Sequence, residues 1–268
     1  MKLTSLLSAG ALMTAMASPA AIAAAANTDA STSPMSDAQQ KQIEKIVHDY
    51  LVANPEVLLE ASQALQQKQQ QAMQVQAQAA IQSNADKIIN DNLTVAGNPK
   101  GNVTLVEFFD YQCIHCKKMA PVISDLAKQN GNLRIVYKEF PIFGKSSETA
   151  SRAALAAAMQ GKYMAMHDAL IKQDGRLNDD MIMSAAKAAG LNVAKLKADM
   201  NSKTVTDALN ANRQLAEQLH LMGTPAFILA ATPDGKLKQG TTPTFIPGAA
   251  SEESLQELIK SAGSSSAS

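Results

Sequence analysis

Aromatic residues and net charge are what this 268-residue sequence has least of. It contains no tryptophan, its aromatic content is 4%, and 24 lysines and arginines balance 24 aspartates and glutamates. Nucleic-acid-binding proteins usually carry a basic face, and single-stranded nucleic acids stack on aromatic side chains. The composition therefore argues against a nucleic-acid partner.

Cysteine is also scarce, since the chain has only Cys113 and Cys116, spaced C-x-x-C. An exported scaffold held together by disulfides would carry more cysteines, spread along the chain. A disulfide that closes so short a loop removes little entropy from the unfolded chain and stabilises little. A zinc site needs a second pair of ligands, and His48, His167 and His220 are dispersed. The pair is better explained by thiol reactivity, and no metal or organic cofactor is expected.

Long hydrophobic runs are missing after the first residues of the sequence. Residues 1–23 follow the order of a secretory signal, with Lys2, an apolar stretch and an A-x-A cleavage site at residues 21–23. The apolar stretch is too short to span a bilayer comfortably, although an uncleaved amphipathic anchor is the alternative. We therefore expect export to an oxidising compartment. Residues 24–35 lack periodicity and are expected to form a disordered leader.

Residues 36–92 are expected to form a helical arm. Ser36 and Gln39 match a capping box at the start of a first helix. Its apolar residues follow helical spacing at Ile43, Ile46, Val47, Tyr50 and Leu51. A second helix, from Pro55 to about Asn90, is rich in glutamine and too polar to be buried on all sides. We interpret the region as a homo-oligomerisation arm that forms a dimer or, alternatively, a trimer; a solvated glutamine-rich spacer is the other interpretation.

A second domain is predicted over residues 93–262, followed by a disordered tail at 263–268. Residues 103–109 and 133–138 predict strands on either side of a helix over 117–129. That order implies parallel strands joined by a right-handed crossover. A helical block over about 147–220 follows, then a strand at 226–229, a turn at 233–235, a second strand near Leu237 and a helix over 252–260. The element order predicts an α/β, thioredoxin-like fold with a helical insertion.

The C-x-x-C pair lies where the first strand gives way to the helix. The N–H groups and dipole at a helix N-terminus favour a thiolate, so Cys113 is predicted to be the attacking thiol. Cys116 lies one turn further along the same face and is predicted to resolve the mixed disulfide. His115, between them, would stabilise the thiolate of Cys113 by hydrogen bonding or positive charge.

Three separated segments resemble the DsbA family of bacterial periplasmic disulfide oxidoreductases. Residues 108–116 (FFDYQCIHC) are similar to the active-site segment, 223–227 (GTPAF) to the cis-proline loop and 245–249 (FIPGA) to the C-terminal signature. The resemblance covers roughly residues 97–262. It implies a periplasmic location, with surface association as a variant, and a cis-proline that lies against the attacking cysteine.

The resemblance also implies roles for individual residues. Thr224 and Pro225 would hold an extended substrate strand, with Ile114 as a further substrate contact. Glu107 matches the family's buried acid behind the active site and Lys138 its charged neighbour, and together they would relay protons to the second cysteine. A plain strand carboxylate and a surface lysine are the alternatives for these two residues.

The expected function is therefore that of a thiol–disulfide oxidoreductase acting on unfolded or misfolded exported proteins. As an oxidase it would be recharged by a DsbB-like membrane partner, and as an isomerase it would be kept reduced by a DsbD-like one. Ile114-His115 stands where the best-known oxidases have Pro-His, which leaves the redox poise open, and the helical arm resembles that of Com1-like and ScsC-like relatives.

The alternative function is copper handling or surface binding on the same scaffold, because the chain has 13 methionines. Five of them have helical spacings that also suit core packing. They are Met159, Met164, Met166, Met181 and Met183.

Overall fold

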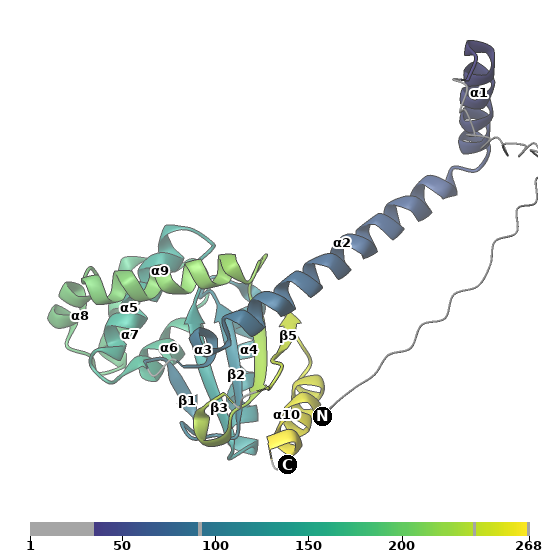
Figure 1. Cartoon of the computed structure of the whole chain (residues 1–268). Helices are drawn as coiled ribbons and strands as arrows, with labels where there is room; N and C mark the ends of the chain where they lie inside the picture. Colours follow the sequence, from purple (N-terminus) through teal and green to yellow (C-terminus); the bar gives the residue numbers. More distant parts are fainter. Residues whose placement is uncertain (1–34, 91–92, 238–239, 267–268) are drawn as a thin grey trace, which may run out of the picture. The chain divides into compact units, whose positions relative to one another are not determined.

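The computed structural model describes residues 35–90, 93–237 and 240–266 (Figure 1). The predicted signal at 1–23 and nearly all of the predicted leader lie outside the described residues. The chain divides into two compact units, with the boundary between Ala61 and Ser62. None of the described helices is both long enough and apolar enough to cross a membrane.

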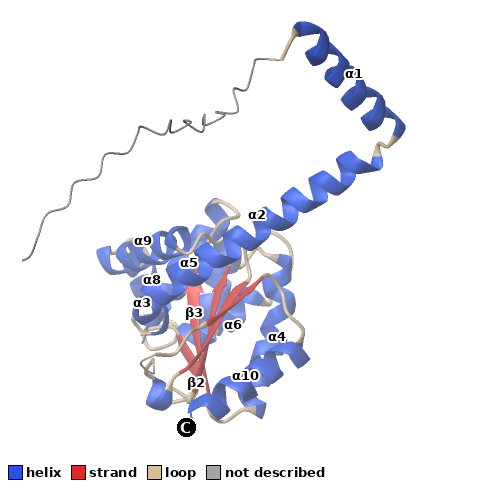
Figure 2. Ribbon diagram, turned by 45° about the vertical axis from the view of Figure 1, so that its right-hand side comes forward, coloured by secondary structure: helices blue, strands red, loops and turns tan. Residues whose placement is uncertain are grey.

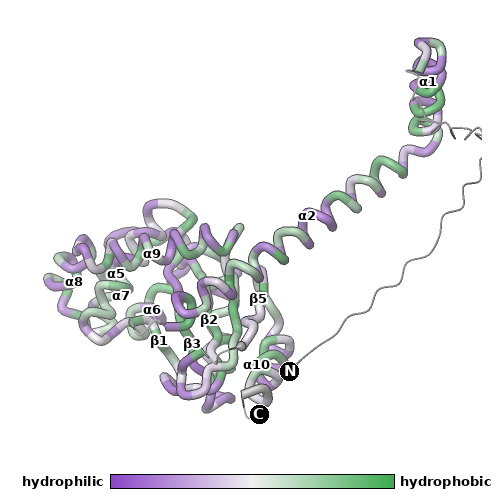
Figure 3. The backbone as a smooth tube through the Cα atoms, in the orientation of Figure 1, coloured by the Kyte–Doolittle hydropathy of each residue, from purple (hydrophilic) through white to green (hydrophobic). Residues whose placement is uncertain are grey.

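The N-terminal unit contains helix α1 (Asp37–Ala53) and the first turns of α2 (Glu56–Ser83). The predicted capping box at the start of α1 is confirmed: the Ser36 hydroxyl accepts from the Gln39 N–H, and the Gln39 side chain accepts from the Ser36 N–H. Apolar residues recur along α1 (Figure 3). None of them is buried, so α1 keeps an exposed apolar face in the described structure.

The second unit contains a five-stranded sheet and the remaining helices. The strands are β1 (Val95–Gly97), β2 (Val103–Phe109), β3 (Leu133–Glu139), β4 (Ala226–Ala231) and β5 (Thr244–Pro247). The helices after α2 are α3 (Ala85–Ile89), α4 (Ile114–Gln129), α5 (Lys145–Ala158), α6 (Tyr163–Ile171), α7 (Asp179–Ala188), α8 (Val193–Asp199), α9 (Lys203–Gln218) and α10 (Glu252–Ser266), with a 3₁₀ turn η1 (Pro233–Gly235).

The strand order is β1-β3-β2-β4-β5, with β2 at the centre of the sheet. β2 and β3 are parallel and are joined through α4, which confirms the predicted strand–helix–strand unit. β4 pairs antiparallel with β2, and β5 pairs antiparallel with β4. Helices α5 to α9 lie between β3 and β4 in the chain, as the predicted helical insertion requires.

The sheet is buried on both faces, since each face packs against a core. Successive side chains of a strand point to opposite faces. Leu105 and Phe109 of β2 face a large core that includes residues of α4, α10 and the insertion. Val106 and Phe108 face a smaller core with the end of α2, with α3 and with the last turns of α9. Figure 2 shows α4 and α10 on one side of the sheet and α3 and α9 on the other.

The elements near the domain ends differ from the predictions. The second strand of the predicted hairpin is β5, at 244–247, rather than a strand near Leu237. The last helix runs to Ser266, so residues 263–266 of the predicted tail are helical. Ile81, Ile88 and Ile89 of the predicted arm are fully buried in the smaller core. They pack there with strand residues such as Val106 and Phe108. The sequence pattern of the arm alone does not predict these contacts.

The methionines of the insertion largely follow the packing prediction. Met166 is fully buried, and Met164, Met181 and Met183 pack against the main core. Met159 is 40% exposed. Most of these side chains are therefore accounted for by packing.

Candidate active site

The two cysteines lie at the start of α4, directly after the central strand. Cys113 is the N-cap of α4, and its Sγ accepts a hydrogen bond from the Cys116 N–H at 3.4 Å. Both thiols are free and buried, with Cys113 3% and Cys116 1% exposed. Unpaired N–H groups and the dipole at a helix N-terminus favour negative charge on the N-cap sulfur. The geometry suits a thiolate at Cys113.

The loop before β4 faces the first cysteine. The peptide bond between Thr224 and Pro225 is cis, as the resemblance implied. The Cys113 thiol donates a hydrogen bond to the Thr224 carbonyl oxygen, with 3.2 Å between Sγ and O. This hydrogen bond joins Cys113 to Thr224, which lies 111 positions later in the sequence. Ile114 and His115, between the cysteines, are exposed beside this contact.

The central strand places a buried acid on the cysteine side of the sheet. Glu107 lies between Leu105 and Phe109 on the face of the main core, and burial raises the pKa of its carboxyl well above the ordinary value. Burial, and next the charge of Glu107, raise the pKa of the Cys116 thiol. The second cysteine therefore keeps its proton at neutral pH and is a poor thiolate at rest.

Lys138 is not placed beside Glu107. In the parallel register Glu107 pairs with Tyr137, while Lys138 pairs with Phe108, so the lysine points to the opposite face of the sheet. There its ammonium group donates to the backbone carbonyl of Lys87 in α3 at 3.3 Å. The predicted relay between Glu107 and Lys138 is corrected accordingly, because a one-residue offset moves a side chain across the sheet.

A buried aspartate that the sequence analysis did not single out holds the cysteine loop in place. One carboxylate oxygen of Asp110 accepts from the Gln112 N–H at 2.6 Å and from the Ser147 hydroxyl at 2.7 Å. The other accepts from the N–H groups of Ile142 and Phe143 at 2.7 and 3.0 Å. Asp110 thus ties the loop before Cys113 to the loop after β3 and to α5.

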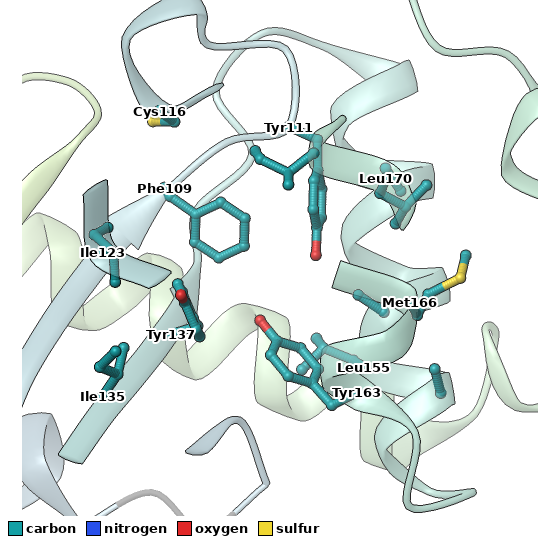
Figure 4. Close-up of a cluster of buried hydrophobic side chains, with 14 of the residues drawn as sticks. Phe109, Tyr111, Cys116, Ile123, Ile135, Tyr137, Leu155, Tyr163, Met166 and Leu170 are labelled. Atoms are coloured by element: carbon teal, nitrogen blue, oxygen red, sulfur yellow. The ribbon is translucent and has the colours of Figure 1, made fainter. Parts of the chain in front are cut away.

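A second buried acid, Glu139, also went unrecognised in the sequence. The hydroxyls of Tyr111 and Tyr163 donate to its Oε1 at 3.0 and 2.8 Å, and Figure 4 shows the two hydroxyls directed toward a common space. The ring of His167 lies against the rings of Phe109, Tyr111 and Tyr163. Because Tyr111 stands two residues before Cys113, this network anchors the cysteine loop from inside the domain.

The pKa values of this network make stability depend on pH. Burial raises the pKa of Glu139 from 4.5 to about 8, although hydroxyls that hydrogen bond to the carboxylate oppose the shift. Burial lowers the pKa of His167 from 6.5 to about 3. Above pH 6.5 most of the histidine is neutral in both the folded and unfolded states. Between pH 6.5 and 8 the folded chain holds a proton on Glu139 that the unfolded chain has released, so stability falls as pH rises.

We expect Glu139→Gln to flatten that fall, because glutamine resembles the protonated acid. One proton changes the free energy of unfolding by at most about 1.4 kcal/mol per pH unit. Thermal unfolding followed by circular dichroism across this pH range measures the slope. Glu253→Gln, at an exposed position of α10, is the matched control and should keep the wild-type slope. Equal slopes for the two variants would contradict the assignment.

Comparison with known proteins places this geometry among thiol–disulfide proteins. A family model described as the DSBA-like thioredoxin domain matches residues 104–260. A second, described as the copper resistance protein ScsC N-terminal domain, matches residues 39–72. The thiol:disulfide interchange protein DsbA of Bordetella parapertussis is 29% identical over 144 residues, which cover 52% of this chain and 68% of that protein.

Solved structures are similar over most of the chain. Salmonella enterica Typhimurium BcfH has a TM-score of 0.69 and 32% identity, covering 84% of this chain and 96% of that one. Proteus mirabilis ScsC in a transitional conformation has a TM-score of 0.61 and 30% identity, covering 87% and 98%. The chain also matches Na⁺/H⁺ antiporters and spans about a fifth of their length: for NhaA 1 of Salinispora arenicola the match is 26% identical over 137 residues and covers 21% of that protein.

Proposed function

Since this chain belongs to the DSBA-like thioredoxin domain family, we propose that it is a periplasmic oxidoreductase that introduces or isomerises disulfides in exported proteins. One observation carries the proposal. An N-capping Cys113 sulfur faces the Thr224 carbonyl at 3.2 Å, with buried Cys116 one turn behind it. That arrangement places one sulfur beside the loop proposed to hold a client and keeps the other behind it for the resolving step.

In the oxidising direction, the chain starts with a disulfide between Cys113 and Cys116. A client thiolate attacks the Cys113 sulfur, a client–Cys113 disulfide forms, and Cys116 leaves as a thiolate that takes up a proton. A second client thiolate then attacks the client sulfur of the mixed disulfide and releases Cys113. The client loses two electrons and the cysteine pair gains them. In isomerisation, Cys113 enters and leaves by the same exchanges with no net change in oxidation state.

Glu107 is proposed to supply and recover the proton of Cys116. Burial raises the pKa of this carboxyl, so it holds a proton where the leaving thiolate needs one. A neutral Glu107 also spares the departing sulfur a neighbouring negative charge. His115, exposed next to the attacking sulfur, is proposed to stabilise the Cys113 thiolate. Thr224 and Pro225 are proposed to hold the client strand with Ile114.

The exposed face of α1 supports the proposal of a homo-oligomer. Ile43, Ile46, Val47 and Tyr50 are all between 46% and 59% exposed on one side of the helix. Four large apolar side chains on one face favour a partner helix in water. Two active sites within one oligomer would suit isomerase work, because both can engage one misfolded client.

We expect Ile46→Glu to raise the dissociation constant of the oligomer by about tenfold or more, because burying an isoleucine is worth roughly 1.5 to 3 kcal/mol. Sedimentation velocity over a dilution series of the full chain measures the change. Lys41→Gln, which makes the same change in net charge on the opposite side of α1, should leave assembly unchanged. A wild-type chain that sediments as a monomer would contradict the proposed arm.

The balance of oxidase and isomerase is tested by the redox state of the pair in cells. Acid quenching followed by alkylation of free thiols and gel electrophoresis reads that state. A mostly oxidised Cys113–Cys116 pair supports a disulfide donor recharged by a DsbB-like partner. A mostly reduced pair supports an isomerase held ready by a DsbD-like partner. Cysteines that never form a disulfide with each other or with clients would contradict both.

Copper handling is the second candidate, favoured by the match of residues 39–72 to the N-terminal domain of a copper resistance protein. Among the described residues, no group of three or more histidine, cysteine, aspartate or glutamate side chains is placed to hold a metal ion. A scaffold that handles copper without thiol exchange predicts that Cys113→Ala leaves copper tolerance intact. A disulfide enzyme whose clients confer that tolerance predicts its loss.

A further inference from the structure

A groove of about 340 Å³ runs beside the cis-proline loop. One wall is the C-terminal half of α2, with Met73 and Ala77, and the other is the loop before β4, with Met222 and Thr224. Phe245 of β5 also lines the groove. None of the residues that line the groove is an aspartate, glutamate, lysine or arginine. The groove is therefore largely apolar, and its polar side chains are those of Gln70, Gln74, His220 and Thr224.

The groove adjoins the reacting sulfur through Thr224. Thr224 lines it, and the carbonyl oxygen of the same residue lies 3.2 Å from the Sγ of Cys113. An extended chain advances about 3.4 Å per residue. A client whose cysteine is bonded to Cys113 therefore brings residues two or three positions away from that cysteine into the groove.

From this proximity we infer that α2 forms one wall of a client-binding groove, which selects extended segments carrying a large apolar side chain near the reacting cysteine. The inference rests on the proposed function and adds a substrate class to it. Met73 is 45% exposed and Met222 88% exposed, which leaves both thioethers free to pack against a client. Methionine is unbranched and polarisable, so it adapts to side chains of different shape.

The inference gives α2 two roles. Gln70, within the segment that matches the ScsC N-terminal domain, lines the groove together with Met73. The N-terminal region therefore contributes to the client site as well as to the proposed assembly. A charged client residue would lose hydration in this groove and would find no carboxylate, ammonium or guanidinium group there as an ion-pair partner.

The test uses the full chain carrying Cys116→Ala, with Cys113 loaded as a mixed disulfide with thionitrobenzoate. A client thiolate attacks the Cys113 sulfur, the bond to thionitrobenzoate breaks, and a coloured thiolate leaves. Two peptides with a single cysteine are compared, with leucine or the uncharged, isosteric asparagine two residues from that cysteine on both sides. We expect the leucine peptide to react about tenfold faster, as partial burial of one leucine allows.

Met73→Glu and Met222→Glu are each expected to reduce that ratio to about twofold or less. Val75→Glu is the matched control, since Val75 lies on the same helix, is 66% exposed and does not line the groove. It should keep the ratio. The inference is overturned if the methionine variants keep the ratio or if Val75→Glu loses it as well. It is also overturned if the methionine variants act by changing the sedimentation of the chain, because the groove would then hold a second copy.

Reaction of the loaded chain with glutathione separates this inference from the proposed function. Glutathione is too small to depend on the α2 wall, so the wild-type chain and the Val75→Glu variant should react with it at the same rate. Normal reaction with glutathione and no preference between the peptides would contradict the client-binding groove and leave the proposed oxidoreductase function intact. If the loaded Cys113 reacted with glutathione no faster than a small-molecule mixed disulfide does, the proposed oxidoreductase function itself would be contradicted.

Discussion

Replacing Cys113 with alanine is expected to reduce disulfide exchange by roughly a thousandfold or more, to the level of the uncatalysed reaction. Exchange requires a thiolate that reaches the client disulfide. Cys116 cannot take over, because it lies one turn inside α4 rather than at its N-cap and because burial raises the pKa of its thiol, which therefore keeps its proton. Refolding of a test protein with scrambled disulfides, in a glutathione buffer, measures the loss.

The complementary variant should behave differently. Cys116→Ala keeps the attacking sulfur and loses the resolving one, so covalent mixed disulfides with clients should accumulate. Non-reducing gels of the quenched reaction detect them. Thermal unfolding of both variants controls for folding. The assignment of roles would be reversed if Cys113→Ala trapped clients and Cys116→Ala did not.

Replacing Asp110 with alanine is expected to destabilise the domain by about 3 to 5 kcal/mol, because it leaves several buried donors without their charged acceptor. The carboxylate accepts from three backbone N–H groups and from the Ser147 hydroxyl. The Cys113 N–H donates to the backbone carbonyl of Asp110 at 3.1 Å. The cysteine loop should therefore lose its position when Asp110 is no longer held. Urea denaturation measures the free energy of unfolding.

Two further variants separate the charge of Asp110 from a general effect of substitution. Asp110→Asn keeps an acceptor oxygen but places an amide against N–H donors, so its destabilisation should be nearly as large. Asp125→Asn removes a carboxylate that is half exposed on α4 and paired with Lys128, and should cost less than about 1 kcal/mol. Similar losses of unfolding free energy at both positions would contradict the proposed role of the Asp110 hydrogen bonds.

Local sequence patterns were enough to predict the reactive part of the fold. The β-branched run of β2, the C-x-x-C pair after it and the helix that follows form a contiguous unit. Its strand, helix and parallel partner follow from local periodicity and the handedness of crossovers. The capping box at Ser36 was also local and is confirmed.

What the sequence could not reveal depends on contacts between distant residues. Tyr111 and Tyr163 meet at Glu139 across separations of 28 and 24 residues, and no spacing rule connects them. The face of Lys138 depends on its register with β2, which one residue of slip would reverse. The sequence gives only weak evidence for the hydrogen bonds of Asp110, namely an acidic residue between a buried strand and the cysteine loop. The groove required α2 to lie beside Thr224, which helical periodicity alone does not encode.

The most direct test of the account is a redox titration of the full chain in glutathione buffers of graded potential. Because the chain has no tryptophan, acid quenching, alkylation and mass measurement should replace fluorescence as the readout. The account predicts one two-electron transition between a dithiol and an intramolecular disulfide of Cys113 with Cys116. Cysteines that stay reduced across the whole range, or that form only disulfides between chains, would contradict it.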